Sequence, residues 1–261
     1  MVVANANVDI TNHASLVSQL IRLGDDHLVL GHRLSEWCGH APMLEEDLAM
    51  PNIALDLLGQ ARALYTYAGS LENKGRDEDA IAYNRLEHEY TNLLICERPN
   101  GDFAHTMIRQ LFFSCFMHQY WQQALNSADE NIAAIAGKAV KESDYHVRHT
   151  AQWVIRLGDG THESARRSLD ALHQLAPYVN ELFETDDIAA ACAANNLVPA
   201  PSSIEAGWNE QMSDILEQAK LPMPEYQLGQ SGGRQGRHTE SMGYLLAELQ
   251  FLQRSYPDMQ W

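Results

Sequence analysis

The chain has 261 residues, 45% of them hydrophobic and 20% charged, proportions typical of one large globular domain with a sizeable core. Its formal net charge of −17 argues against nucleic acid and anionic membranes as main partners, because phosphate contacts need clustered Lys and Arg. Four scattered cysteines without a CxxC pair, no secretory signal in residues 1–12 and no apolar run of ~20 residues favour a cytoplasmic protein with reduced thiols and no membrane span.

Hydrophobic spacing predicts helices along the whole chain and no β-strand. Residues 1–13 are expected to form a loose tail, followed by two long antiparallel helices over about 14–38 and 43–73, with Pro51 kinking the second or capping a short turn before it. Further helices are predicted over about 78–96, 103–127, 130–157, 161–183 with a kink at Pro177, 186–195, 203–219 and 239–255, and a loop over 221–238. Asp102 and Thr161 are the expected N-caps of two of them. The fold class is therefore all-α, in a single domain of residues 1–261.

Polar ridges inside the apolar faces of the two long helices suggest a helical bundle whose interior is, or once was, a carboxylate site. A di-iron bundle of this kind needs a Glu from each of two helices and a Glu-x-x-His from each of the other two. The candidate positions are degenerate in this chain: Glu36, Asp56, Gly59, Glu142, Tyr145 and His146. Gly59 has no side chain, and Tyr145 stands three residues after Glu142, with His146 one step further.

The helix predicted over 103–127 decides against a di-iron site. It contains no Asp or Glu, and offers Gln110, Ser114 and His118 instead. We therefore expect no bound metal and no cofactor, and we expect Glu36, Asp56 and Glu142 to lie near each other in the core, held by side-chain hydrogen bonds. Arg33, Arg62, Tyr145, His146 and His149 are the plausible donors. A zinc site at His146 and His149 has no third ligand placed by the sequence.

The same helix is apolar nearly all round, with aromatic and sulfur-containing side chains at Phe112, Phe113, Phe116, Met117, Tyr120 and Trp121. Such a helix is buried on all sides. Two explanations stay open at this point: a central place in the domain, or a contact with another subunit.

A Gly-rich basic loop, Gly232 to His238, precedes the last predicted helix, which Thr239 is expected to cap. Free N–H groups, the helix dipole and two guanidiniums would suit an anion, so Arg234, Arg237 and His238 are candidate contacts for an anionic ligand or partner. The alternative is a flexible surface loop with incidental charges.

Four segments are specific enough to indicate a family: GDDHLVLGHRLSEWCGHAPMLEED, LLICERPNGDFAHTMIRQ, KAVKESDYHVRH and GGRQGRHTESMGYLLAELQ. They closely resemble the C-subunit family of phenylacetyl-CoA epoxidase, the multicomponent monooxygenase of phenylacetate degradation, over nearly the whole chain after about Ser18. The resemblance implies a ferritin-like four-helix bundle core with additional C-terminal helices. It also implies a non-catalytic structural subunit that pairs with the di-iron catalytic A subunit and with other epoxidase subunits.

Under this hypothesis the basic loop is a candidate contact for the coenzyme A moiety of the substrate, and the chain alone is a candidate homodimer. The competing hypotheses are a di-metal carboxylate oxygenase or oxidase that acts by itself, and a homodimeric binding protein without a catalytic partner.

Overall fold

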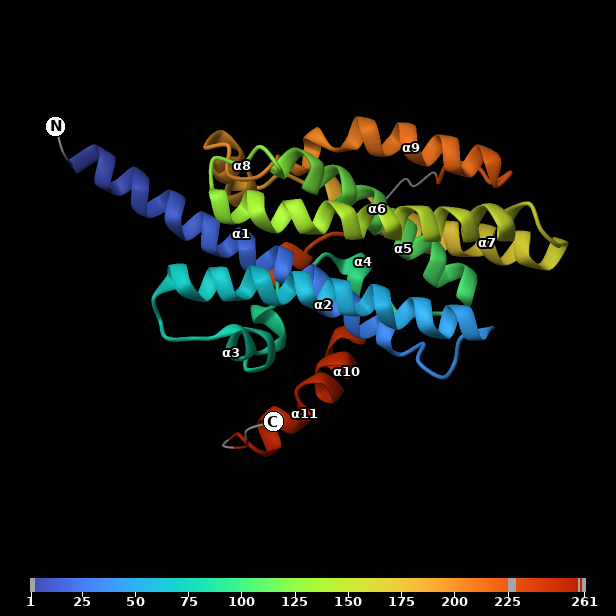
Figure 1. The fold of residues 1–261 in the computed structure, drawn as a ribbon, viewed down its shortest axis with the longest axis horizontal. Helices are drawn as coiled ribbons and strands as arrows, with labels where there is room; N and C mark the ends of the chain where they lie inside the picture. The colour runs from blue at the N-terminus through green and yellow to red at the C-terminus, as the bar shows by residue number, and fades with distance from the viewer. Residues whose placement is uncertain (1–2, 225–228, 258, 260–261) are drawn as a thin grey trace. The chain divides into compact units, whose positions relative to one another are not determined.

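The computed structural model describes residues 3–224, 229–257 and 259, with the backbone alone for residues 3–12. Every regular element in these residues is a helix, so the fold class is all-α, as the sequence predicts (Figure 1). The chain divides into two compact units, residues 1–99 with 232–261 and residues 100–231. Each unit contains one long helix pair, the element from which ferritin-like bundles are built.

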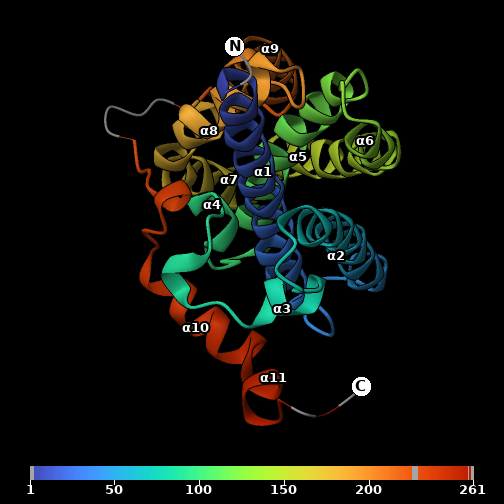
Figure 2. The same cartoon turned by 90° about the vertical axis from the view of Figure 1, so that its left-hand side faces the viewer.

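The first unit is discontinuous in sequence. Its helices are α1 (Val3–Ser35), α2 (Leu44–Glu72), α3 (Glu78–Tyr83), η1 (Glu87–Glu89), α4 (Leu94–Glu97), η5 (Gly233–Gln235), α10 (Glu240–Leu249) and α11 (Phe251–Ser255). The short connection between α1 and α2 makes them antiparallel neighbours, and α10 contacts α4 and η1 (Figure 2). The C-terminal segment is therefore part of the same unit as the first 99 residues.

The apolar faces predicted for the two long helices form the core of this unit. Leu20 and Leu30 of α1 and Ile53 and Leu64 of α2 are each at most 1% exposed. Gly24 lets α1 approach closely, because a Cβ at this position would overlap the ring of Tyr65.

Two expectations for the first unit are wrong, and one of the two alternatives for Pro51 is excluded. α1 begins at Val3, although a loose tail is predicted over residues 1–13. Residues 3–13 contain no Gly or Pro, the two residues that oppose a helix most strongly. The helix predicted over 78–96 is broken into α3, η1 and α4, with irregular backbone between them. α2 continues through Pro51, which excludes a separate short turn before the helix, and the alternative, a kink at this proline, stays a prediction.

The second unit is continuous in sequence. Its helices are α5 (Phe103–Ala124), α6 (Glu130–Gly158), α7 (His162–Leu175), η2 (Ala176–Tyr178), η3 (Asn180–Phe183), α8 (Asp187–Ala194), η4 (Pro201–Ser203) and α9 (Glu205–Gln218). α5 packs along α6 and also contacts α7 and α9. The helix predicted over 161–183 with a kink at Pro177 is shorter than expected: α7 ends at Leu175, and Pro177 lies in a 3-10 turn, so the proline ends the α-helix.

The aromatic side chains of α5 are core residues. Phe112 stacks edge-on against Trp208 with ring centroids 5.5 Å apart, and Phe116 packs on Phe183 at 5.9 Å. The indole N–H of Trp208 also donates to the Phe112 carbonyl at 3.0 Å. Since Phe112 and Phe116 are at most 2% exposed, central burial accounts for the apolar surface of this helix.

Two predicted N-caps are present and one is not. The Asp102 carboxylate accepts from His105 N at 2.9 Å, and the Thr161 hydroxyl accepts from Ser164 N at 3.1 Å. The Thr239 side chain makes no capping hydrogen bond to α10. Its backbone N–H instead donates to the Glu97 carboxylate at 2.5 Å, which places an acid from α4 at the N-terminus of α10, where the helix dipole favours negative charge.

Candidate functional site: a buried ionic network in the first unit

Three fully buried carboxylates in the first unit form the strongest electrostatic feature of the described chain. Asp25 and Asp26 are adjacent on α1, and Glu97 ends α4; each is 0% exposed. A buried charge is costly unless a counter-ion and hydrogen bonds compensate it. The partners of these acids therefore indicate what the site can do.

Asp25 accepts hydrogen bonds on both oxygens. Arg85 donates to Oδ2 at 3.0 Å and also pairs with Oδ1, which accepts the Tyr65 hydroxyl at 2.6 Å. The Thr91 backbone N–H and hydroxyl reach Oδ2 at 2.7 and 3.1 Å. Burial and the Asp25 charge raise the pKa of Tyr65 well above its ordinary value, so its hydroxyl stays a donor.

Asp26 is held by the C-terminal segment. Arg234 forms a two-pronged ion pair with it, at 3.0 Å to Oδ1 and 2.8 Å to Oδ2, and the Leu93 N–H donates to Oδ1 at 2.7 Å. Burial raises the pKa of Asp26 to about 6, although the Arg234 charge opposes this rise. Arg234 also donates to the Thr91 carbonyl at 2.8 Å and so connects α1, the irregular segment and η5.

Glu97 is the second anchor of the C-terminal segment. Its carboxylate lies 2.8 Å from Nδ1 of His238 and accepts from Asn92 at 3.0 Å, besides the Thr239 N–H. Burial by itself would lower the pKa of His238, but the hydrogen bond and charge of Glu97 outweigh it and the pKa is raised. The Glu97 backbone carbonyl accepts two hydrogen bonds from Arg33, at 3.1 and 3.0 Å.

We call these residues the buried ionic network: Asp25, Asp26 and Glu97 with their partners Arg85, Arg234 and His238. The network joins segments that are far apart in the sequence, so its chemistry is that of a structural site. Each carboxylate is occupied by internal donors, so none presents a free oxygen to a substrate. The sequence gives a weak sign of it, since Asp25 and Asp26 lie beside the apolar stripe of this helix, between Leu23 and Leu30. The pairing with residues about 60 and 208 positions away has no local signal.

The positions predicted to form a degenerate di-iron site are not all buried. Glu36 is wrong as a core residue: its side chain is 41% exposed and pairs with Arg33 at 2.8 Å, because it follows the end of α1. Tyr145 is 41% exposed and Glu142 pairs with Lys138 at 3.2 Å, whereas His146 is buried. Asp56 and Gly59 are half-buried on α2, in the other unit from Glu142.

The donor set does not fit a di-iron centre. In α5 the buried positions are occupied by neutral groups, with the Gln110 amide donating to the Ser114 hydroxyl at 3.1 Å. Across the residues that the structure describes, no group of three His, Cys, Asp or Glu is placed to hold a metal ion. The His146 and His149 pair therefore has no third metal ligand among them.

The basic loop is largely used inside the protein. Arg234 and His238, predicted as anion contacts, donate to Asp26 and Glu97 instead, because the loop turns inward at η5. Arg237 is exposed, next to Gly232, whose φ of 130° is readily adopted by glycine. An external anion contact therefore stays a prediction for Arg237 alone.

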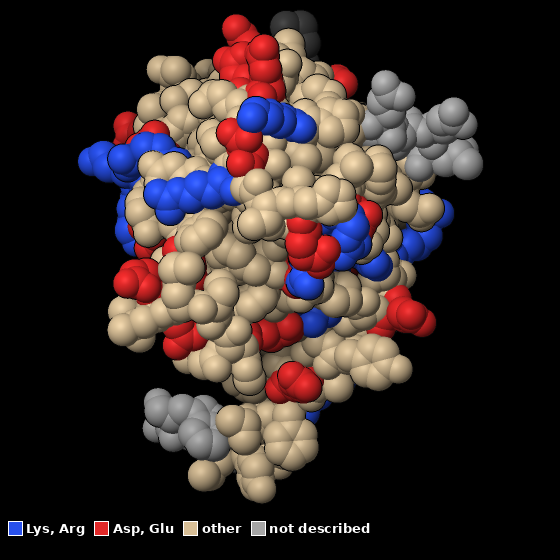
Figure 3. Space-filling view, turned by 90° about the vertical axis from the view of Figure 1, so that its right-hand side faces the viewer, with Lys and Arg blue, Asp and Glu red and all other residues tan. Residues whose placement is uncertain are grey.

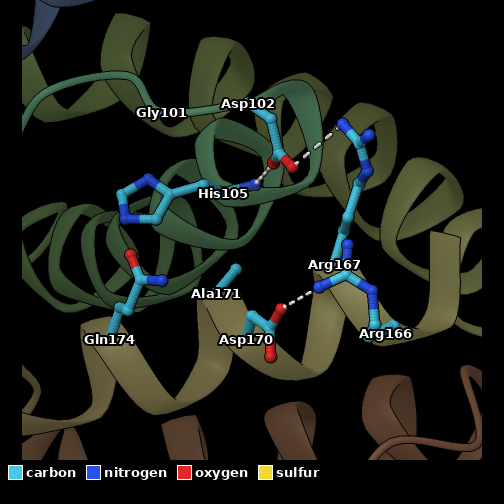
Figure 4. A pocket seen from close by; sticks show the side chains of 8 residues that line it. All are labelled: Gly101, Asp102, His105, Arg166, Arg167, Asp170, Ala171 and Gln174. Carbon is cyan, nitrogen blue, oxygen red and sulfur yellow. Dashed lines mark hydrogen bonds and ion pairs between the residues drawn. The ribbon is translucent and has the colours of Figure 1, made fainter. Parts of the chain in front are cut away.

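A shallow pocket of ≈ 200 Å³ lies on the second unit where α5 begins beside α7 (Figure 4). Arg166 and Arg167 line it, but each is paired: Arg166 with Asp170 at 2.7 Å, and Arg167 with Asp102 at 3.4 Å. Both also hydrogen-bond to Glu163, which lowers the pKa of this carboxyl to about 2. With its cations neutralised by acids, the pocket has no excess of positive charge for an anionic ligand.

Positive charge is dispersed elsewhere too. On the face drawn in Figure 3, Lys and Arg side chains lie among Asp and Glu and form no continuous basic patch.

In the described part of the chain, no helix has both the length and the apolar character needed to cross a bilayer.

Comparison with known proteins gives two matches. The family model for phenylacetic acid catabolic proteins matches residues 1–261. A relative from Escherichia coli (strain K12), the C subunit of 1,2-phenylacetyl-CoA epoxidase, is 43% identical over 246 residues, which cover 94% of this chain and 99% of the relative.

Proposed function

The chain belongs to the phenylacetic acid catabolic protein family, and from this membership we propose that it is a structural subunit of a multicomponent phenylacetyl-CoA epoxidase. It pairs with the catalytic di-iron A subunit of that enzyme and stabilises it, without binding metal itself. The name of the relative supports the assembly, because an enzyme with a C subunit has other subunits.

The composition of α5 carries the non-catalytic part of the proposal. A ferritin-like di-iron bundle takes a carboxylate ligand from each of its four long helices, yet the long helix α5 contains neither Asp nor Glu. Its buried polar pair, Gln110 and Ser114, is neutral and hydrogen-bonded internally. Amide and hydroxyl groups are poor substitutes for the bridging carboxylates that hold two iron ions, which favours a supporting role.

The proposal is tested by purifying the chain alone and after co-expression with the catalytic subunit. We expect co-elution in size exclusion, iron bound in proportion to the catalytic subunit, and epoxidation of phenylacetyl-CoA only when both chains are present. About two iron ions per chain in the isolated protein, with oxygenase activity, would support the competing autonomous oxygenase.

A variant makes the test sharper. The double change Asp56→Ala and Glu142→Ala removes two of the acids that an active di-metal site in this chain would need. We expect the co-expressed complex to keep its iron content and epoxidation rate. Loss of iron and activity in a complex that still assembles would contradict the non-catalytic role.

A further inference from the structure

The outward face of the first half of α2 is apolar. Leu44, Leu48 and Leu55 lie on one side of the helix at spacings of four and seven residues, and are 70%, 60% and 65% exposed. They are called the leucine face here. A single exposed Leu is ordinary on a protein surface, but three aligned on one helix face form an apolar patch of the kind that binds another chain.

The opposite side of α2 is already used. Met50, Ile53 and Leu57 are at most 2% exposed and belong to the core of the first unit. A helix with apolar residues on both sides is stable in water when both sides are covered. One apolar side of α2 is therefore buried in the first unit, and the other, the leucine face, is exposed.

Most charged residues around the leucine face are acids. From Leu34 to Ala61 the sequence contains five acids and no Lys or Arg. The next charged residue, Arg62, lies on the same side of α2 seven residues after Leu55, and its charge is paired with Glu78 at 3.0 Å. Of the acids, Glu45 is exposed beside Leu44 and Leu48, and Asp56 is half-buried beside Leu55. Asp47 accepts from the Gly39 N–H at 2.7 Å, which fastens the connection before α2 to the helix.

This charge pattern selects the partner. A stable interface buries about 800 Å² per partner, so the leucine face would be the apolar centre of a contact whose rim includes the acids. Two copies of this chain would bring like charges together at that rim, in a chain whose net charge is −17. A partner with an apolar centre and a rim of Lys or Arg would be complementary.

We propose that the leucine face of α2 docks a different protein chain, which presents an apolar helix face bordered by Lys and Arg. The inference rests on the proposed function and deepens it, because it assigns the surface by which this protein engages the catalytic subunit. The aromatic side chains of α5 are excluded from that role by their burial.

The test compares two double variants in pull-down and titration against the co-expressed catalytic subunit. Leu48→Glu with Leu55→Glu changes the leucine face, and Leu125→Glu with Leu252→Glu makes the same change at exposed leucines elsewhere. We expect the first pair to lose on the order of 100-fold in affinity and the control pair to keep the parental affinity. If the two double variants bind the catalytic subunit with equal affinity, the inference is wrong.

Failure of the proposed function gives a different result, since the parental chain would then not bind the catalytic subunit at all. In that case the leucine face has no role in this assembly either. If the parental chain binds and the leucine-face variant binds equally well, the proposed function stands and the inference falls.

The acidic rim gives a second measurement. Raising NaCl from about 50 to about 500 mM should weaken the heterologous complex several-fold, and Glu45→Lys should weaken it at low salt. If the isolated chain forms a dimer that Leu48→Glu with Leu55→Glu dissociates, while binding of the catalytic subunit is unchanged, the face serves a second copy and the inference is wrong.

Thiol labelling removes dependence on disruptive substitutions. In a Cys38→Ser background, Leu48→Cys and Leu125→Cys each place one reactive thiol at an exposed position, because the other three cysteines are buried. We expect the catalytic subunit to protect Cys at position 48 and not at position 125. Labelling of position 48 at the same rate in the complex as in the free chain would overturn the inference.

Discussion

Asp25 illustrates how the first unit tolerates a carboxylate at 0% exposure. Its oxygens accept hydrogen bonds of 2.6–3.1 Å from a guanidinium, a phenol, a hydroxyl and a backbone amide. Arg85 in turn lies 4.1 Å from the centre of the Tyr90 ring and donates to the Ile81 carbonyl at 2.6 Å. The pair is therefore stable as a unit, and each half depends on the other.

Replacing Arg85 tests this dependence. Arg85→Met leaves Asp25 buried without its counter-ion, so we expect a loss of about 3–5 kcal/mol in the free energy of unfolding, measured by urea denaturation. Arg62→Met is the matched control, because Arg62 pairs with Glu78 while its side chain is 77% exposed, and should cost less than about 1 kcal/mol. Equal small losses in both variants would mean that the Asp25–Arg85 pair contributes nothing.

His238 gives the protein a pH-dependent contact. Its pKa in the folded state is raised above the ordinary 6.5, so the protonated ring is favoured by folding. That contribution is fully present below pH 6.5 and is lost as the pH rises through the raised pKa. We expect His238→Gln to reduce the urea midpoint more at about pH 6 than at about pH 9.

The control for this prediction is His173→Gln, at an exposed position on α7. It should change the urea midpoint little, and equally at both pH values. A His238→Gln effect that grows toward alkaline pH would contradict the assigned direction of the pKa shift.

At the scale of elements, the break between α3 and α4 follows from the acids of α1. The Thr91 and Leu93 N–H groups donate to Asp25 and Asp26. These amides face away from their own segment, so the backbone between α3 and α4 cannot continue a helix through them. Local propensity favours one helix over this range, and the buried acids override it.

Close helix packing within the first unit depends on Gly24. A Cβ there would overlap the Tyr65 ring, whereas a Cβ at Gly137 on α6 has nothing within 4 Å. We expect Gly24→Ala to destabilise the protein by about 1–3 kcal/mol and Gly137→Ala to stabilise it by about 0.5–1 kcal/mol, in thermal unfolding. Destabilisation by both changes would show that α6 also lacks room.

At the scale of the whole molecule, the chain ends in the unit where it begins. Arg234 and His238 reach back to Asp26 and Glu97, and Gln250 donates to the Arg85 carbonyl at 2.8 Å. The first unit is therefore complete only with the C-terminal segment in place. The second unit needs no such return.

Truncation tests the return of the chain. Deleting residues 232–261 leaves Asp26 and Glu97 buried without Arg234 and His238. Each uncompensated charge costs about 3–5 kcal/mol, and the sum of the two costs approaches the total unfolding free energy of a typical domain. We expect no cooperative thermal transition for the first unit in this variant. Deleting residues 256–261 leaves Arg234, His238, Gln250 and Arg254 in place and should keep that transition.

The sequence by itself determined the all-α class, the positions of α2, α5 and α6 within a few residues, and the caps at Asp102 and Thr161. These features are local: helix periodicity and capping involve residues three or four positions apart. The same local comparison exposed the missing carboxylate in α5, and the characteristic segments indicated the family that the comparisons confirm.

Only the tertiary structure decided which polar residues are buried and which apolar residues are not. Arg234 pairs with Asp26 across 208 positions and His238 with Glu97 across 141, and no periodic pattern records such distances. For the same reason Glu36 was expected in the core although it is exposed, and the sequence of α2 does not distinguish the exposed Leu48 from the buried Leu57. A helix face shows that residues point the same way, but the path of the remaining chain determines whether anything covers them.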